Sequence, residues 1–147
     1  MIVFAMGFLV FCLDQLSKQL VQKNMIPGES ISLIPGMFHL TYVQNTGAAF
    51  GILKEKTSFF VVITALVVMA IVFAIPHIQR EHLFLRSALG LMLGGALGNF
   101  VDRARFGHVI DFIDFRIWPV FNVADMAIVM AVGFLFWKLL VHNPEGL

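Results

Sequence analysis

Residues 90–125, GLMLGGALGNFVDRARFGHVIDFIDFRIWPVFNVAD, decide how the rest of the chain is interpreted. Gly90, Gly94 and Gly98 recur every four residues within an apolar run. This is the spacing of close helix–helix contacts in lipid, where small residues let two backbones approach. Polar residues, which are costly at membrane depth and therefore functional candidates, follow this glycine stripe: Asn99, Asp102, Arg103, Asp111, Asp114, Asn122 and Asp125. The stretch predicts an active site with a pair of acids at one membrane surface.

The composition is that of a membrane protein. Of the 147 residues, 59% are hydrophobic and 13% are charged, whereas a soluble domain is roughly half apolar. The length allows one compact bundle, so we expect a single integral membrane domain over residues 1–147. The formal net charge of +1 gives no indication of a nucleic-acid partner, and the single cysteine excludes an intrachain disulfide.

Four apolar runs are long enough to cross the roughly 30 Å of hydrocarbon, which takes about 20 helical residues. They cover about residues 2–21, 58–75, 83–101 and 120–140. We therefore expect a mainly α membrane protein, built as a four-transmembrane-helix bundle.

The insert over about residues 22–56 separates the first two runs. Turn signals surround two strand-like segments, 31–34 and 37–43, which predict a small antiparallel β-sheet. The following segment, 45–51, is rich in glycine and alanine and suits a tight turn or a short surface helix. Sheet and surface helix are expected on one membrane face.

Alternation of the spans predicts that one face collects most of the polar residues. These are Asp14, Lys18, Asn45, Asn99, Asp102, Arg103, Asp111 and Asp125. The same face carries most of the cations, Lys23, Lys54, Lys56, Arg103, Arg105 and Arg116, against Arg80, Arg86 and Lys138 on the other. By the positive-inside rule, this count alone predicts a cytoplasmic site.

Asp111, Asp114 and Asp125 are the candidate catalytic acids. Two carboxylates about 3 Å apart cannot both ionise and therefore share a proton. The ionised one can take a proton from water while the neutral one donates to a carbonyl oxygen, which hydrolyses an amide without metal or cofactor. A strand through VIDFIDF would point Asp111 and Asp114 to opposite faces, so only one of them can join Asp125. From the residues alone, both pairings stay open.

Two further groups allow a structural or a functional interpretation. Asp14 and Lys18 stand four residues apart, acid first, which is the favourable order for a helical ion pair at the membrane surface. Asn99, Asp102 and Arg103 can orient the substrate or the acids, or can serve as hydrogen-bonding contacts between helices.

The amides of Asn45 and Asn122 can bind a substrate backbone, although Asn122 can instead cap the last helix. A serine–lysine hydrolase at Ser17–Lys18 is disfavoured because adjacent helical positions point about 100° apart. The five histidines lack metal-ligand spacing. The rival functions are a small proton-coupled transporter or channel subunit, which would spread its ionisable residues through the bilayer, and a structural membrane-assembly subunit.

Five segments follow one another in a characteristic order: DQLSK (14–18), NTGAAFG (45–51), GGALGNFVDR (94–103), GHVIDF (107–112) and FNVAD (121–125). Together they resemble the motifs of the lipoprotein signal peptidase family, also called signal peptidase II, over nearly the whole chain. The resemblance implies an aspartyl endopeptidase of the bacterial inner membrane. Such an enzyme cuts the signal peptide of a prolipoprotein just before its diacylglyceryl-modified cysteine.

The resemblance selects Asp111 over Asp114 and pairs it with Asp125. It implies supporting roles for Asp14, Lys18, Asn45, Gly47, Asn99, Asp102, Arg103 and Asn122. The expected partners are lipid-modified prolipoproteins, membrane phospholipid and the inhibitor globomycin, with no nucleic acid, cofactor or metal, and we expect a monomer. The resemblance places the site at the periplasmic or outer leaflet with cytoplasmic termini, which opposes the Lys/Arg count.

Overall fold

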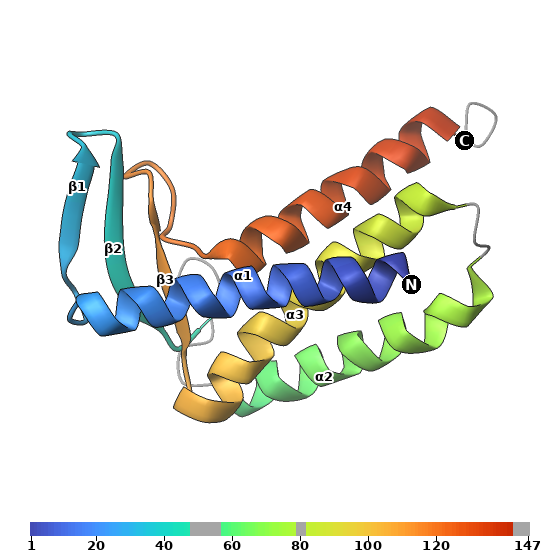
Figure 1. Cartoon of the computed structure of the whole chain (residues 1–147), viewed down its shortest axis with the longest axis horizontal. Helices are drawn as coiled ribbons and strands as arrows, with labels where there is room; N and C mark the ends of the chain where they lie inside the picture. The colour runs from blue at the N-terminus through green and yellow to red at the C-terminus, as the bar shows by residue number, and fades with distance from the viewer. Residues whose placement is uncertain (48–56, 79–81, 143–147) are drawn as a thin grey trace.

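The computed structural model describes residues 1–47, 57–78 and 82–142, and Figure 1 shows their arrangement. The short surface helix or turn predicted for 45–51 lies largely outside the described residues. The helices are α1 (Ile2–Asn24), α2 (Thr57–Ala74) with the 3-10 turn η2 (Ile75–His77), α3 (Leu83–Phe106) and α4 (Val123–His142).

Within the described residues, three helices are long and apolar enough to cross a membrane: α1, α2 with η2, and α3. The chain is therefore a membrane protein, as the composition predicted. A membrane crossing by α4 stays a prediction.

α1 and α3 extend beyond the apolar runs that predicted them, which ended at about residues 21 and 101, because hydropathy marks the limit of the membrane rather than of the helix. α3 continues to Phe106 and ends at Gly107, whose φ of 77° gives the left-handed conformation that closes many helices. The Gly107 N–H donates to the Arg103 carbonyl oxygen at 3.0 Å. The helix therefore carries its polar residues, among them Asp102, past the end of the glycine stripe.

The start of α4 is fixed by a reciprocal cap. The Asp125 N–H donates to Asn122 Oδ1 at 2.9 Å, and the Asn122 N–H approaches Asp125 Oδ2 at 3.4 Å. This is a capping box, in which two otherwise unpaired N–H groups are satisfied. It explains why the helix begins at Val123 rather than at residue 120, and it fixes Asp125 in the first turn.

The sheet has three antiparallel strands in the order β1 (Ser30–Ile34), β2 (Phe38–Asn45) and β3 (Val109–Asp114). The first two are the predicted pair. The third follows α3 and pairs with β2, with Val43 opposite Asp111 and Asn45 opposite Val109. The sheet lies at one end of the helices, away from the N-terminus and the end of α4 (Figure 1).

Glycines on α3 set its distance from the neighbouring helices. A methyl group on Gly90 would lie 2.8 Å from the Val3 carbonyl oxygen of α1, and one on Gly94 would overlap the carbonyl oxygen of Gly7. On another face, a methyl group on Gly95 would lie 2.5 Å from the Ala124 carbonyl oxygen of α4. The predicted stripe therefore packs α3 closely against α1. Gly95, on another face of α3, allows the same close contact with α4.

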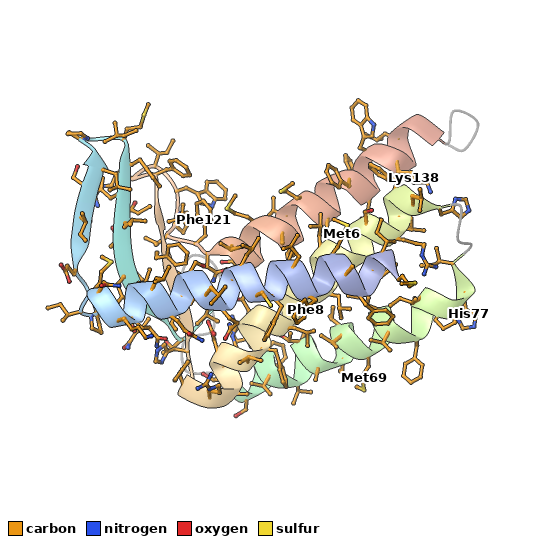
Figure 2. All side chains as sticks on the ribbon, in the orientation of Figure 1. Met6, Phe8, Met69, His77, Phe121 and Lys138 are labelled. Atoms are coloured by element: carbon orange, nitrogen blue, oxygen red, sulfur yellow. The ribbon has the colours of Figure 1, made fainter. Side chains whose placement is uncertain are left out.

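Large apolar side chains surround this bundle on the outside, as expected for a surface in lipid. Phe8 is 70% exposed and Met69 is 47% exposed, and both project from the helices in Figure 2. The polar interior is instead concentrated where the helices meet the sheet, which positions the candidate site.

Candidate active site

Asp111 and Asp125 line one cavity of about 1090 Å³ at the junction of α3, α4, β2 and β3. Asp111 comes from β3 and Asp125 from the first turn of α4. Asn45, Asn99 and Arg103 also line this space. Gly47, just after β2, lines it as well, so the fold brings together six of the predicted site residues.

Two amides hold the Asp111 carboxylate. Asn45 Nδ2 donates to Oδ2 at 2.9 Å and Asn122 Nδ2 donates to Oδ1 at 2.7 Å. Burial and, secondly, the neighbouring charge of Asp125 raise the pKa of Asp111 to about 7, although both amide bonds oppose the shift. Asp111 can therefore hold a proton near neutral pH.

Asp125 is held differently. Asn99 Nδ2 donates to its Oδ1 at 2.7 Å, and its other oxygen has the long contact to the Asn122 N–H. A carboxylate in the first turn of a helix also lies in the favourable field of the helix dipole. Asn122 joins the two acids, since its side-chain amide donates to Asp111 and its oxygen accepts from the Asp125 backbone.

A buried ion cluster lies beside this cavity. Lys18 Nζ is 2.8 Å from both Asp14 Oδ2 and Asp102 Oδ2. Gln15 Nε2 donates to Asp102 Oδ1 at 3.0 Å, and the Ala124 N–H donates to Asp14 Oδ1 at 2.9 Å. The cluster joins α1, α3 and α4, so the predicted Asp14–Lys18 pair exists and extends to Asp102.

The ion cluster and the acid pair meet at Asn99. Lys18 Nζ donates to Asn99 Oδ1 at 3.0 Å, and Asn122 Nδ2 donates to the same oxygen at 3.2 Å. With Oδ1 occupied by donors, Asn99 must turn its NH₂ group toward Asp125. The ion cluster of Lys18, Asp14 and Asp102 therefore does not line the cavity. It supports the acid pair indirectly, through its hydrogen bond to Asn99.

Asp114 occupies a separate environment. Its carboxylate accepts from Thr41 Oγ1 at 2.7 Å and pairs with Arg116 at 3.1 Å. Burial raises the pKa of Asp114, but the hydrogen bonds from Thr41 and Arg116 and the Arg116 charge outweigh it, so the net pKa is lowered. Of the two acids on β3, only Asp111 lines the cavity with Asp125.

Arg103 and Gly47, which both line the cavity, contact each other. Arg103 Nη2 donates to the Gly47 carbonyl oxygen at 3.3 Å, and its guanidinium lies 5.1 Å from the centre of the Phe60 ring. The Gly47 N–H donates to Asn45 Oδ1 at 3.0 Å, which orients the Asn45 amide toward Asp111. Gly47 therefore positions two of the polar side chains that face the cavity.

Sequence reasoning missed two features of this site. Gln15, although it lies within the DQLSK segment, was not predicted as a site residue, yet it bonds Asp14, Asp102 and the Gly98 carbonyl oxygen. Its position next to Asp14 was the available signal. The cavity also has a broad apolar wall that no motif indicated: Phe115, Ile117, Trp118, Val120, Phe121, Met126, Ile128, Val129 and Met130.

Two solved structures share this architecture. Both are bacterial membrane enzyme structures obtained by the in meso method, at 2.3 and 1.9 Å resolution. The first is 34% identical with a TM-score of 0.90, covering 99% of this chain and 93% of that one. The second is 36% identical with a TM-score of 0.86, covering 95% and 92%. The fold is thus that of a bacterial membrane enzyme.

The sequence profile of the family Signal peptidase (SPase) II matches residues 6–141. The lipoprotein signal peptidase of Moorella thermoacetica is 54% identical over 95% of this chain and 93% of its own length. That of Pelotomaculum thermopropionicum is 46% identical over 99% and 96%. The chain belongs to the signal peptidase II family, which agrees with the resemblance of its motifs.

Proposed function

We propose that this protein is an aspartyl endopeptidase in which Asp111 and Asp125 activate water together. The observation that carries the proposal is that both carboxylates line one cavity and are held by amide groups. Within the described residues, neither carboxylate forms an ion pair. An acid pair without a cation can share one proton, as this chemistry requires.

In the proposed reaction, protonated Asp111 donates a hydrogen bond to the scissile carbonyl oxygen and transfers its proton to that oxygen as water adds to the carbonyl carbon. Ionised Asp125 takes a proton from water, whose oxygen attacks the carbonyl carbon to form a tetrahedral intermediate. When the intermediate collapses, the C–N bond breaks, the leaving nitrogen receives a proton from Asp125, and the proton on the former carbonyl oxygen returns to Asp111. The pair ends as it began, so no cofactor is consumed.

The proposed substrate is a diacylglyceryl-modified prolipoprotein, cut just before its lipidated cysteine. The names of the relatives and the apolar wall of the cavity support this choice, because a lipid-linked peptide needs polar groups at the scissile bond and an apolar surface for its acyl chains. Asn45 and Arg103 are suited to hold the peptide backbone. We expect the cyclic lipopeptide globomycin to compete for the same cavity.

The proposed location is the bacterial inner membrane, with α4 as the fourth span. The sheet and the acid pair would lie toward the periplasm or outer leaflet, and the termini in the cytoplasm. The placement of the sheet at the end of the bundle opposite the N-terminus supports this arrangement (Figure 1). The Lys/Arg count opposes it, but one of the counted cations, Arg103, lines the proposed site and so has a role other than setting the orientation.

A proton-coupled transporter is the less favoured alternative. A relay needs ionisable groups distributed across the membrane, whereas Asp14, Lys18, Asp102, Asp111 and Asp125 form one connected group beside the sheet. The sequence of α2 has no charged residue at all. The arrangement is that of a local site.

The test is cleavage of a lipid-modified precursor by purified Asp111→Asn and Asp125→Asn variants. Each should lose about 10²–10⁴-fold in rate, the usual contribution of a positioned acid or base. Asp114→Asn is the matched control, because it makes the same change on the same strand outside the cavity, and it should keep most of its activity. Near wild-type cleavage by either of the first two variants would refute the proposal.

A further inference from the structure

A second hollow lies between α1 and α3 near the sheet. Its volume is about 210 Å³, and it shares no lining residue with the cavity of the acid pair. Gln19, Gln22 and Lys23 line it from α1, and Arg105 lines it from α3. The proposed peptidase reaction makes no use of these four side chains.

The hollow presents positive charge that is not neutralised. Within the described part of the chain, neither Lys23 nor Arg105 forms an ion pair. The Arg105 guanidinium lies 5.1 Å from the centre of the Phe106 ring, which leaves its N–H edge available. Two cations and two uncharged amides favour an anion with several oxygen atoms, such as a phosphate group.

Two charged groups from the buried ion cluster also reach the wall, but both are already satisfied. Lys18 uses its three ammonium hydrogens on Asp14, Asp102 and Asn99. Asp102 accepts from Lys18, from Gln15 and from the Ile110 N–H. The charged hydrogen-bond donors that a ligand can still use therefore come from Lys23 and Arg105.

The surroundings of the hollow are apolar and exposed. Leu16 and Leu20 neighbour the polar face of α1 and are 58% and 62% exposed. On a membrane-spanning helix such side chains contact lipid. A ligand here would have its charged group in the hollow and an apolar part along these leucines, and basic pockets between transmembrane helices bind anionic lipid head groups in this way.

We propose that this hollow binds the phosphate of an anionic phospholipid. Lys23 and Arg105 contact the phosphate oxygens, Gln19 and Gln22 donate to the head group, and an acyl chain lies along Leu16 and Leu20. The site shares no residue with the cavity of the acid pair, so this proposal does not depend on the proposed peptidase function.

The test is native mass spectrometry of the full chain in detergent, titrated with phosphatidylglycerol or with zwitterionic phosphatidylcholine. The wild type should bind phosphatidylglycerol about 30-fold more tightly, the equivalent of about 1 kcal/mol for each of the two basic residues near the anionic head group. The Lys23→Gln/Arg105→Gln double variant should lose this preference. Arg86→Gln/Lys138→Gln removes the same charge at the other end of α3 and α4 and should keep it.

Arg105→Lys retains the charge and should retain most of the preference, which separates loss of binding from loss of folding. Inorganic phosphate should not displace the lipid, because it lacks the apolar contacts. The proposal is overturned if the Lys23/Arg105 double variant keeps its preference or the control variant loses it equally. Displacement by inorganic phosphate would indicate a site for a free anion and would also overturn it.

Discussion

The molecule contains two pairs of carboxylates that are held in opposite ways. Asp14 and Asp102 share the ammonium group of Lys18, and each of their oxygens accepts at least one bond from protein. Asp111 and Asp125 have only amide and backbone donors and face a cavity. The first pair shares one cation and is closed to the cavity, whereas the second pair is open to the cavity and can exchange protons with a bound ligand.

The two pairs are joined through one side chain. Asn99 accepts from Lys18 and donates to Asp125, so the closed pair determines how the open pair is oriented. We infer that the ionic pair provides rigidity and the amide-held pair provides chemistry. Substitutions in and around each pair separate these two roles.

Lys18→Met should destabilise the protein most. The change leaves Asp14 and Asp102 buried without a cation, and breaking a buried pair in this way costs about 3–5 kcal/mol. The free energy of unfolding in detergent measures the effect, with Lys138→Met near the far end of α4 as the control (Figure 2). An unchanged free energy in Lys18→Met would mean that the closed pair gives no rigidity.

Stability should fall as the pH rises toward neutrality because of Asp111. Its pKa is raised from 3.8 to about 7 in the folded protein, so between these values the folded state binds more protons than the unfolded state. Each pKa unit by which the folded and unfolded states differ changes the free energy of unfolding by about 1.4 kcal/mol. The loss is complete once the pH passes the folded pKa. Asp111→Asn should flatten the dependence in denaturation measured from about pH 4 to pH 8, and an equal slope in both proteins would contradict it.

Gly94→Ala should lower the free energy of unfolding by about 1–3 kcal/mol, the usual effect of overpacking. The added methyl group overlaps the Gly7 carbonyl oxygen and would push α1 away from α3, which carry the closed pair. Gly133→Ala on α4 is the control, because a methyl group there meets nothing within 4 Å. Thermal unfolding compares the two, and equal stability would show that the glycine stripe does not set the helix distance.

Asn45→Ala should reduce cleavage about tenfold while leaving the fold intact, because it removes one of the two side-chain amides that position the Asp111 carboxyl group. The matched change is Thr41→Ala on the same strand, which removes a donor to Asp114 instead. Its cleavage rate should stay near that of wild type. If the two variants lose activity equally, the effect comes from the strand and not from the acid pair.

Much of this architecture can be predicted from the sequence, because the bilayer restricts the length of spanning helices and the residues at their contacts. The glycine stripe predicted a close helix–helix contact, which the structure places between α3 and α1, and spacing predicted the Asp14–Lys18 pair. Local patterns could not show that the 109–114 segment joins β2, since strand pairing depends on distant residues. The bridging role of Gln15 and the apolar wall of the cavity were missed for the same reason.

The choice between Asp111 and Asp114 illustrates this limit. Alternation along the strand predicted that only one of them could join Asp125, but not which one. Pairing with β2 places Thr41 within hydrogen-bonding distance of Asp114 and leaves Asp111 to the amides of Asn45 and Asn122. The selection therefore arises from tertiary contacts.

Infrared difference spectroscopy across a pH titration is the most direct test of a proton-sharing pair. The wild type should show a protonated carboxyl band near pH 6 that fades as the pH rises through about 7. The band should be absent from Asp111→Asn and retained in Asp114→Asn. A wild-type protein without this band at that pH, with every carboxyl ionised, would contradict the account.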